Sequence, residues 1–374
     1  MQGKTKKGAR GNGKRRKVGD AGKIKSGVSR EARRELLSLA READARHIKS
    51  ARRDADALGR RLNRHFRTEH IAIQALLQRQ RGFAALQTEA LALKKGLGRK
   101  LEAAAKEPKK AQRAVGAYSK ALRELMEANE SIIERAYRSA IDETRMNEKL
   151  LSLLPVTEGF VMKRGKFGSV VMRAFHHEDD DGTLNPTGRA ADPPLPAVFT
   201  APYDDGADHK EMSLMAAARA FANEETGNLD CHASAFEAGG AAARSLVVSF
   251  VELPSGHTVL KVNARIVCDY IVSSLSLAAA SFGSTDAIVE VIDTDNTVRT
   301  AVTPVDWVLA PVGWSQRHEG DDPYFVDTTF AIPTTGGQFM IRAGVRCNAW
   351  AGGLISDGSG TNRGHVDEIN VDVV

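Results

Sequence analysis

The sequence predicts an α+β protein of several domains, in which a long α-helical bundle or coiled coil precedes an antiparallel, jelly-roll-like β-sandwich. Over residues 28–154 glycine is scarce, a single proline occurs, and strong helix formers predominate. From residue 155 onward come the other eleven prolines and runs of alternating β-branched and polar residues, which are typical of strands. The charge divides at the same place: residues 1–155 carry 38 Lys and Arg against 18 Asp and Glu, whereas residues 156–374 carry 15 against 29.

These changes divide the chain into four predicted regions: a disordered basic arm (1–27), a helical region (28–154), a mixed region with a strand pair, an acidic loop and a short helix (155–235), and the β-sandwich (236–374). The first residues lack the apolar stretch of a signal peptide, and no run approaches the roughly 18 apolar residues of a membrane span. A cytoplasmic protein without a transmembrane segment is therefore expected, with export by a non-classical route as the alternative.

The basic arm is the strongest charge signal in the sequence. Ten of its residues are Lys or Arg and seven are Gly, so it cannot bury enough apolar surface to offset the entropy of ordering. Its cations would bind a polyanion or nucleic acid through phosphates, without reading bases. A solubilising tail and a contact with the acidic domain of a neighbouring subunit are the alternatives. The candidate polyanion-binding residues are Lys4, Lys6, Lys7, Arg10, Lys14, Arg15, Arg16, Lys17, Lys23 and Lys25.

Apolar residues spaced by three and four predict helices over 29–66, 69–106 and 109–153, with breaks near Thr68 and at Pro108. Narrow stripes with charged flanks are typical of a coiled-coil seam, which favours a homo-oligomer over an intramolecular three-helix bundle. A buried Asn129 on the last seam would fix the register of the helices. The stripes are Ile48, Ala51, Ala55, Leu58 and Leu62; Leu86, Ala90, Leu93 and Leu97; and Val115, Tyr118, Leu122 and Leu125.

The mixed region is expected to hold a strand pair at 159–175, a loop at 176–206 and a short helix at 209–222. Asp208 would cap this helix, with Glu211 in the capping-box position. The loop begins with two histidines and a run of acids, so Asp179, Asp180 and Asp181 are candidate ligands of a hard cation. The EF-hand pattern is absent, which favours a solvated acidic loop, and the sequence predicts no metal and no cofactor.

Alternation of apolar and polar residues predicts two strands over 246–251 and 260–268, joined by a turn at Pro254-Ser255-Gly256. About eight strands separated by Gly, Pro, Asp and Asn are typical of a sandwich or a jelly roll. The further strands are expected at 271–281, 286–293, 297–310, 324–332, 338–350 and 364–373.

The strand at 338–350 offers a candidate ligand surface. Because side chains alternate along a strand, Phe339, Ile341, Val345 and Cys347 would face the core. A tryptophan beside Arg and Asn on the wet face is typical of a platform that binds carbohydrate or protein. A tryptophan covered by a loop or by the helical region is the alternative. The candidate surface residues are Arg342, Arg346, Asn348 and Trp350.

Reactive groups are less evident. The sequence has no GxSxG motif, and Cys231, Cys268 and Cys347 are widely spaced, which predicts reduced structural thiols. The favoured hypothesis is a non-enzymatic, multimeric structural or binding protein, whose helical stalk presents a β-sandwich recognition domain. This layout is similar to that of fibre and adhesin proteins. A capsid-like assembly protein that binds nucleic acid through the basic arm is the first alternative, and an enzyme with catalytic residues scattered over the β-domain is the second.

Overall fold

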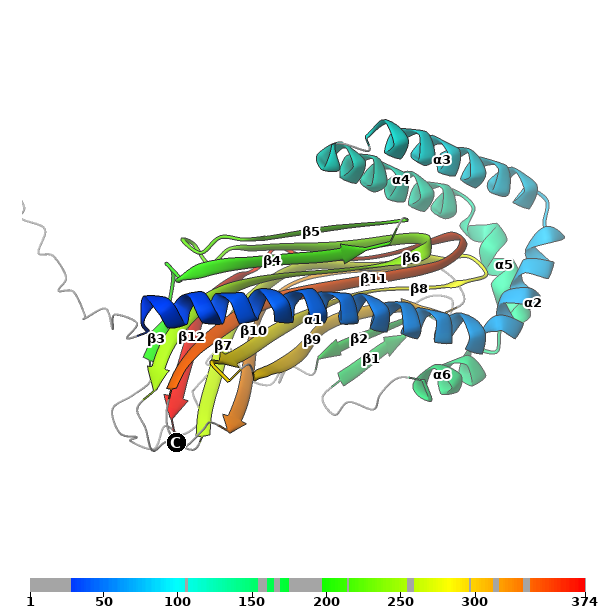
Figure 1. The fold of residues 1–374 in the computed structure, drawn as a ribbon. Coiled ribbons are helices and arrows are strands. Elements are labelled where there is room, and N and C mark those ends of the chain that lie inside the picture. Colours follow the sequence, from blue (N-terminus) through cyan, green and yellow to red (C-terminus); the bar gives the residue numbers. More distant parts are fainter. Residues whose placement is uncertain are drawn as a thin grey trace, which may run out of the picture.

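In the computed structural model, six helices precede twelve strands within the residues that it describes (Figure 1). These are residues 28–104, 107–153, 160–164, 169–174, 197–213, 215–253, 259–295, 297–311, 316–331 and 337–373. The basic arm, the three candidate cation ligands Asp179, Asp180 and Asp181, and the turn at Pro254 lie outside the described residues.

The helices begin and end where the local sequence dictates. The hydroxyl of Ser29 caps the first helix by accepting from the Ala32 amide (3.1 Å), and Pro108 stands at the first position of the fourth, where its missing N–H costs nothing. No helix among the described residues is long and apolar enough to cross a membrane. The helices are α1 (Arg30–His65), α2 (Arg67–Gln78), α3 (Phe83–Ala103), α4 (Pro108–Ala128), α5 (Glu130–Ala140) and α6 (Glu143–Leu151).

The first predicted helix is confirmed, whereas the other two are interrupted. Gly82 has a φ of 94°, which favours glycine, and it separates α2 from α3. Asn129 lies at the break between α4 and α5, where its side-chain amide donates to the Leu125 carbonyl (2.8 Å). It therefore terminates a helix, and the predicted role in helix register is wrong.

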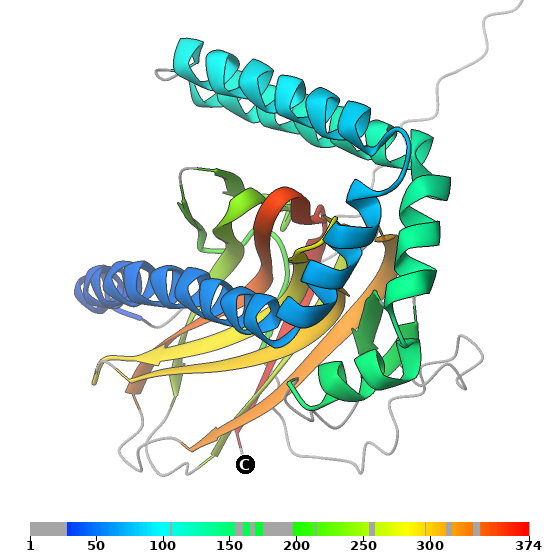
Figure 2. The ribbon, with the colours of Figure 1, turned by 90° about the vertical axis from the view of Figure 1, so that its right-hand side faces the viewer.

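The predicted long bundle or coiled coil is also wrong. Helix α1 lies along one face of the sheet and packs on strands, while α3 and α4 form an antiparallel hairpin at the far end (Figures 1 and 2). Ala55 and Leu62 from the α1 stripe are buried together with Trp350 and Phe282 of the sheet. An alanine-rich stripe needs a closely approaching partner, and here a sheet of the same chain provides it.

All strand pairings among the described residues are antiparallel, and the pairing of β1 with β2 confirms the predicted pair near 159–175. The predicted strands 246–251 and 260–268 lie within β6 and β7, but the predicted hairpin is wrong, because β6 pairs with β4, β5 and β11 whereas β7 pairs with β10, β11 and β12. The strands are β1 (Phe160–Arg164), β2 (Val170–Ala174), β3 (Ala197–Phe199), β4 (Asp205–Met212), β5 (Ala216–Ala222), β6 (Leu229–Leu253), β7 (Val259–Ser276), β8 (Ala280–Asp293), β9 (Val298–Ala310), β10 (Gln316–Ala331), β11 (Gly337–Asn362) and β12 (His365–Val373).

The short helix predicted at 209–222 is wrong, because this segment forms β4 and β5. Both strands pair with β6: β4 with residues 241–248 and β5 with residues 229–235. Helix-favouring alanines adopt the extended form here because the long β6 offers a free edge whose backbone groups need partners. Tertiary pairing overrides the local preference of the segment.

Two long strands turn the sheet into a sandwich. Residues 337–352 of β11 lie between β6 and β8, and after an irregularity its residues 356–362 pair with β7 and with the start of β6. One layer, here called the α1 layer, is β2–β9–β8–β11–β6–β4; the other, the groove layer, is β5–β6–β11–β7 with β10 beyond. β6 and β11 belong to both.

The core between the layers consists of small apolar side chains, mostly Ala and Val. Ile341, Val345 and Cys347 of β11 point into it and are fully buried, which confirms the alternation predicted for this strand. The three cysteines are free and buried, and burial raises the pKa of the Cys347 thiol well above its ordinary value. They act as small apolar side chains.

Gly59 lets α1 approach the sheet, so we expect Gly59→Ala to destabilise the fold. A Cβ at this position would lie 1.9 Å from Cδ2 of Trp350. Overpacking of this kind costs about 1–3 kcal/mol, which exceeds the gain in helix propensity of about 1 kcal/mol. Gly98→Ala in α3 is the matched control, because a Cβ there meets nothing within 4 Å, and it should stabilise. Urea unfolding measures both; equal stabilisation by the two changes would contradict the packing of α1 on Trp350.

Candidate functional site

The residues predicted as an exposed ligand surface lie on the outer face of the α1 layer, and α1 covers them. Trp350 is 5% exposed and Arg342 is fully buried, so the predicted open platform is wrong and its alternative, a tryptophan covered by the helical region, is what the structure has. Arg346 keeps some exposure, and Asn348 is buried with its amide donating to the Ser284 hydroxyl (3.2 Å). Alternation placed all four on the correct face, but it carried no information about α1.

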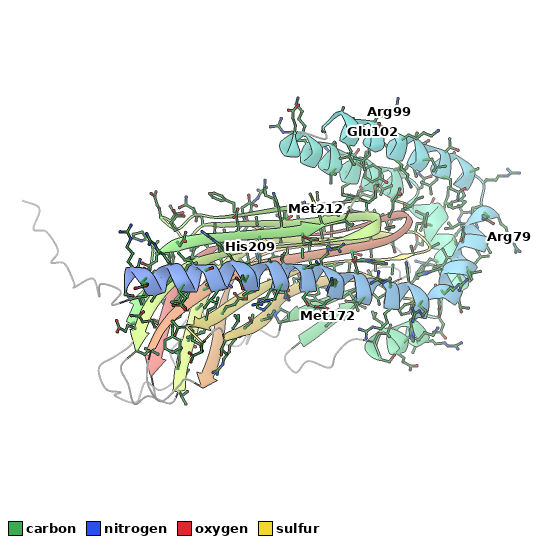
Figure 3. The ribbon with its side chains drawn as sticks, viewed as in Figure 1. Arg79, Arg99, Glu102, Met172, His209 and Met212 are labelled. Carbon is green, nitrogen blue, oxygen red and sulfur yellow. The ribbon has the colours of Figure 1, made fainter. Side chains whose placement is uncertain are left out.

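A buried ion cluster joins α1 to this face. Arg342 donates to both carboxylate oxygens of Asp44 on α1 (2.8 Å each) and to Glu290 on β8 (2.5 Å). Arg244 of β6 also reaches Glu290 (2.5 Å), and the His209 imidazole lies 2.6 Å from Asp44 (Figure 3). The two guanidinium groups balance the two carboxylates, which is the condition for burying charge.

Both carboxyl groups of this cluster stay ionised. Burial by itself would raise the pKa of Asp44, but the hydrogen bond from His209 and the charges of Arg342 and Arg244 hold it below its usual value. The same guanidinium groups keep the pKa of Glu290 far below its usual range, again against the effect of burial. The cluster therefore attaches α1 to the sheet through ion pairs.

On the opposite side of the molecule, a groove of about 1160 Å³ lies between α4 and the outer face of the groove layer. The α3–α4 hairpin stands over these strands (Figures 1 and 2), and Met212 of β4 lies at the edge of the groove (Figure 3). Strands β5, β6, β7 and β11 supply the floor and α4 supplies the opposite wall.

Hydroxyl groups line the floor in a row set by the strand register. Ser359 of β11 pairs with Ser273 of β7 on one side and with Ser234 of β6 on the other. Neighbouring strands lie about 4.8 Å apart, so the three hydroxyls span about 10 Å. The hydroxyls of Ser273 and Ser359 are hydrogen-bonded to each other (2.7 Å). The Ser234 hydroxyl is buried and has no hydrogen-bond partner within the described part of the chain.

A second polar row runs beside the first. Here Thr361 of β11 pairs with His232 of β6, which in turn pairs with Arg219 of β5. The imidazole Nδ1 and the Thr361 hydroxyl are 2.8 Å apart. Burial, assisted by the Arg219 charge, lowers the pKa of His232 to about 4, so at neutral pH its ring offers one donor and one acceptor.

The wall formed by α4 is attached to the sheet through its own polar side chains. Arg123 donates to the Ser273 hydroxyl (3.1 Å), and Ser119 donates to the buried carboxyl of Asp357. Burial raises the pKa of Asp357 to about 6, although the Ser119 hydrogen bond and the Arg123 charge both oppose the rise. These contacts place α4 over the groove.

A second attachment holds the α3–α4 hairpin at the end of the groove. Tyr118 of α4 packs edge-on against Phe236 and donates to Glu237 (3.3 Å), which also pairs with Lys94 of α3. Glu237 is buried and has a φ of 53°, a strained conformation for a residue with a side chain. Strain of this kind persists only where the surroundings impose it.

Charge gathers along the groove. Two carboxylates, Glu124 and Glu127, line it on α4, against six cationic side chains. The cations are Arg113, Lys120, Arg123, Lys210, Arg219 and Arg363. Over the described ranges, no group of three or more His, Cys, Asp or Glu could hold a metal ion. The arrangement is suited to noncovalent binding of a polar ligand.

The sequence did not reveal this site, because its residues come from seven separate elements, α3, α4, β4, β5, β6, β7 and β11. Ser234, Ser273 and Ser359 become neighbours only through the register of three strands. Of the three, only Ser273 lies in a predicted strand (271–281), and no spacing in the sequence marked which strands would be adjacent.

Comparison with known proteins yields little. No family model and no curated protein matches the chain. Among solved structures, TmCBM61 in complex with β-1,4-galactotriose overlaps 46% of this chain and 90% of its own, at 12% identity and a TM-score of 0.21. Tailspike protein 4 of bacteriophage CBA120 overlaps 46% of this chain and 20% of its own, at 10% identity and a TM-score of 0.21. A promiscuous carbohydrate-binding module of the β-sandwich superfamily overlaps 56% of this chain and 97% of its own, at 12% identity and a TM-score of 0.20. Scores this low do not establish a shared fold, so the ligand has to be inferred from the groove itself.

Removing one charge from the ion cluster should destabilise the protein strongly. Asp44→Asn leaves Arg342 and Arg244 with a single buried carboxylate, and breaking a buried pair in this way costs about 3–5 kcal/mol. Asp54→Asn on the same helix is the control, because Asp54 is exposed and should change stability by less than about 0.5 kcal/mol. Chemical denaturation measures both. A loss for Asp44→Asn no larger than the control's would show that α1 is not held by this cluster.

Asp357 should make stability depend on pH. Its pKa is about 6 in the folded protein against an ordinary 3.8, so folding favours the protonated form. That contribution, about 3 kcal/mol, is complete below pH 4 and is lost as the pH rises through 6. Relative to wild type, Asp357→Asn should therefore gain stability between pH 4 and pH 7.5 in thermal unfolding. Ser119→Ala removes a hydrogen bond that opposes the shift and should steepen the wild-type dependence. If the difference in stability between Asp357→Asn and wild type stayed the same from pH 4 to pH 7.5, the raised pKa of Asp357 would be disproved.

Proposed function

We propose that this protein is a non-enzymatic binding protein whose β-sandwich recognises a carbohydrate in the groove beneath α4. The observation that carries the proposal is the floor of the groove, where hydroxyls and a neutral imidazole lie in two rows and the buried Ser234 hydroxyl has no partner among the described residues. A buried polar group without a partner costs free energy, which a ligand hydroxyl would recover.

The mixture of donors and acceptors supports a polyhydroxylated ligand. Each sugar hydroxyl both donates and accepts, and the Ser and Thr hydroxyls, the His232 ring and the carboxylates of Glu124 and Glu127 can serve both needs. Met212 and Ile271 add apolar surface for the C–H faces of sugar rings. The volume exceeds the upper end of ordinary small-molecule pockets, about 1,000 Å³, and suits an oligosaccharide.

The placement of the carboxylates supports binding without hydrolysis. Glycoside hydrolysis ordinarily uses two carboxyl groups on opposite sides of the scissile bond, about 5–9.5 Å apart. Glu124 and Glu127 lie on the same wall of the groove, one turn apart on α4, and Asp357 is buried beneath Ser119. The proposal therefore assigns no catalytic step to these residues.

Two parts of the hypothesis drawn from the sequence stay predictions. Binding of a polyanion or nucleic acid through Lys14–Lys17 concerns residues outside the described ranges. The α1 stripe packs on strands of the same chain, so it is not available for self-association between chains. Exposed apolar side chains on the described helices remain on α2, where Ile71 is 58% exposed, and on the α3–α4 hairpin, where Leu91 is 44% exposed.

Ser234→Ala should move stability and affinity in opposite directions. Removing a buried hydroxyl without a partner should stabilise the free protein by up to about 1 kcal/mol, and it should weaken carbohydrate binding about fivefold by removing one hydrogen bond. Thermal unfolding and native gels containing soluble polysaccharides measure the two effects. Ser139→Ala on the exposed face of α5 is the control for both. Unchanged retardation by every polysaccharide for both Ser234→Ala and His232→Gln would contradict a carbohydrate site in this groove.

A further inference from the structure

The groove carries a local positive charge in a domain that is acidic as a whole. Residues 156–374 hold 15 Lys and Arg against 29 Asp and Glu, yet three of those cations line this one groove: Lys210, Arg219 and Arg363. Three more face it from α4. Clefts lined by one sign of charge focus the field and concentrate ligands of the opposite sign.

Several of these cations are available to a ligand. Arg219 pairs with Asp230 (2.6 Å), and Arg123 is engaged with Ser273 and lies 3.9 Å from Asp357. Lys210 and Arg363 are exposed, and within the part of the chain that the structure describes neither has a carboxylate partner. A cation that stabilises a fold is normally paired with a carboxylate. The described residues provide no such pair for Lys210 or Arg363.

We infer that the ligand is an acidic carbohydrate, a polymer that contains uronic acid, whose carboxylates are bound by Lys210 and Arg363 while its hydroxyls meet the serine row. This inference rests on the proposed function and adds the charge of the sugar to it. A guanidinium group matches a carboxylate in a bidentate geometry, and Lys supplies a point charge at the edge of the groove.

The same groove is less suited to a nucleic acid. Its floor offers acceptors as well as donors, whereas phosphate oxygens require donors alone. Glu124 and Glu127 on the α4 wall would repel the closely spaced phosphates of a nucleic acid, and a uronic acid polymer spaces its charges by whole sugar rings. No tryptophan among the described residues lines the groove to stack with bases.

The test compares polymers that differ only in charge. Polygalacturonate, alginate and hyaluronate are each paired with a carboxyl-reduced form, in which the carboxylate has become a primary alcohol, and single-stranded poly(dT) is included. Affinity is measured on the full chain by native affinity electrophoresis at two salt concentrations. The full-length variant Lys210→Gln/Arg363→Gln tests the groove, and Lys14→Gln/Lys17→Gln is the matched control in the basic arm.

We expect at least one uronic acid polymer to bind about tenfold more tightly than its reduced form, and we expect the groove variant alone to lose this preference. Equal binding of charged and reduced forms would overturn the inference and leave the carbohydrate proposal standing. Loss of the preference in the arm variant would assign it to the arm and overturn the inference. Tighter binding of poly(dT) that depends on Lys210 and Arg363 would replace it with a nucleic-acid site. Binding of no carbohydrate, charged or reduced, would reject the proposed function itself.

Discussion

The ion cluster of Asp44, Glu290, Arg244 and Arg342 is the contact on which the rest of the structure depends. Its two guanidinium groups balance its two carboxylates, and it ties the middle of α1 to three neighbouring strands of the α1 layer, β8, β11 and β6. Apolar contacts on either side of it, around Leu36 and around Leu62, complete the attachment. Because α1 is fixed along its length in this way, the chain leaves the sheet at Phe66, at the far end of the sandwich.

This exit point decides where the remaining helices lie. Helices α2 and α5 pack together at that end, and the α3–α4 hairpin returns over the strands of the groove layer (Figure 2). Polar contacts attach α4 to the sheet, among them Arg123 with Ser273 and Tyr118 with Glu237, and buried apolar side chains such as Leu122 pack in the same cluster as Phe236. A groove lies between α4 and the strands, and the floor of that groove keeps its polar character.

The two outer faces of the sandwich therefore have different uses. On the α1 layer the polar side chains pair with one another and with α1, so they attach the helix to the sheet. On the groove layer, the buried Ser234 and the half-buried His232 lie at the floor of a groove, and the exposed Lys210 and Arg363 line it. The same alternation of apolar and polar residues produced both faces. The difference between them is how completely a helix covers each one.

The sequence by itself determined the change from helices to strands near residue 155, the extent of α1, the buried phase of Ile341, Val345 and Cys347, and the outward phase of Arg342 and Trp350. Those features depend on period and propensity, which act over a few residues. Tertiary structure alone decided that α1 covers Trp350, that the alanine-rich segment 209–222 forms strands along β6, and that Ser234, Ser273 and Ser359 meet in one row. Each of these depends on which distant segment supplies the partner surface, and local spacing carries no record of that choice.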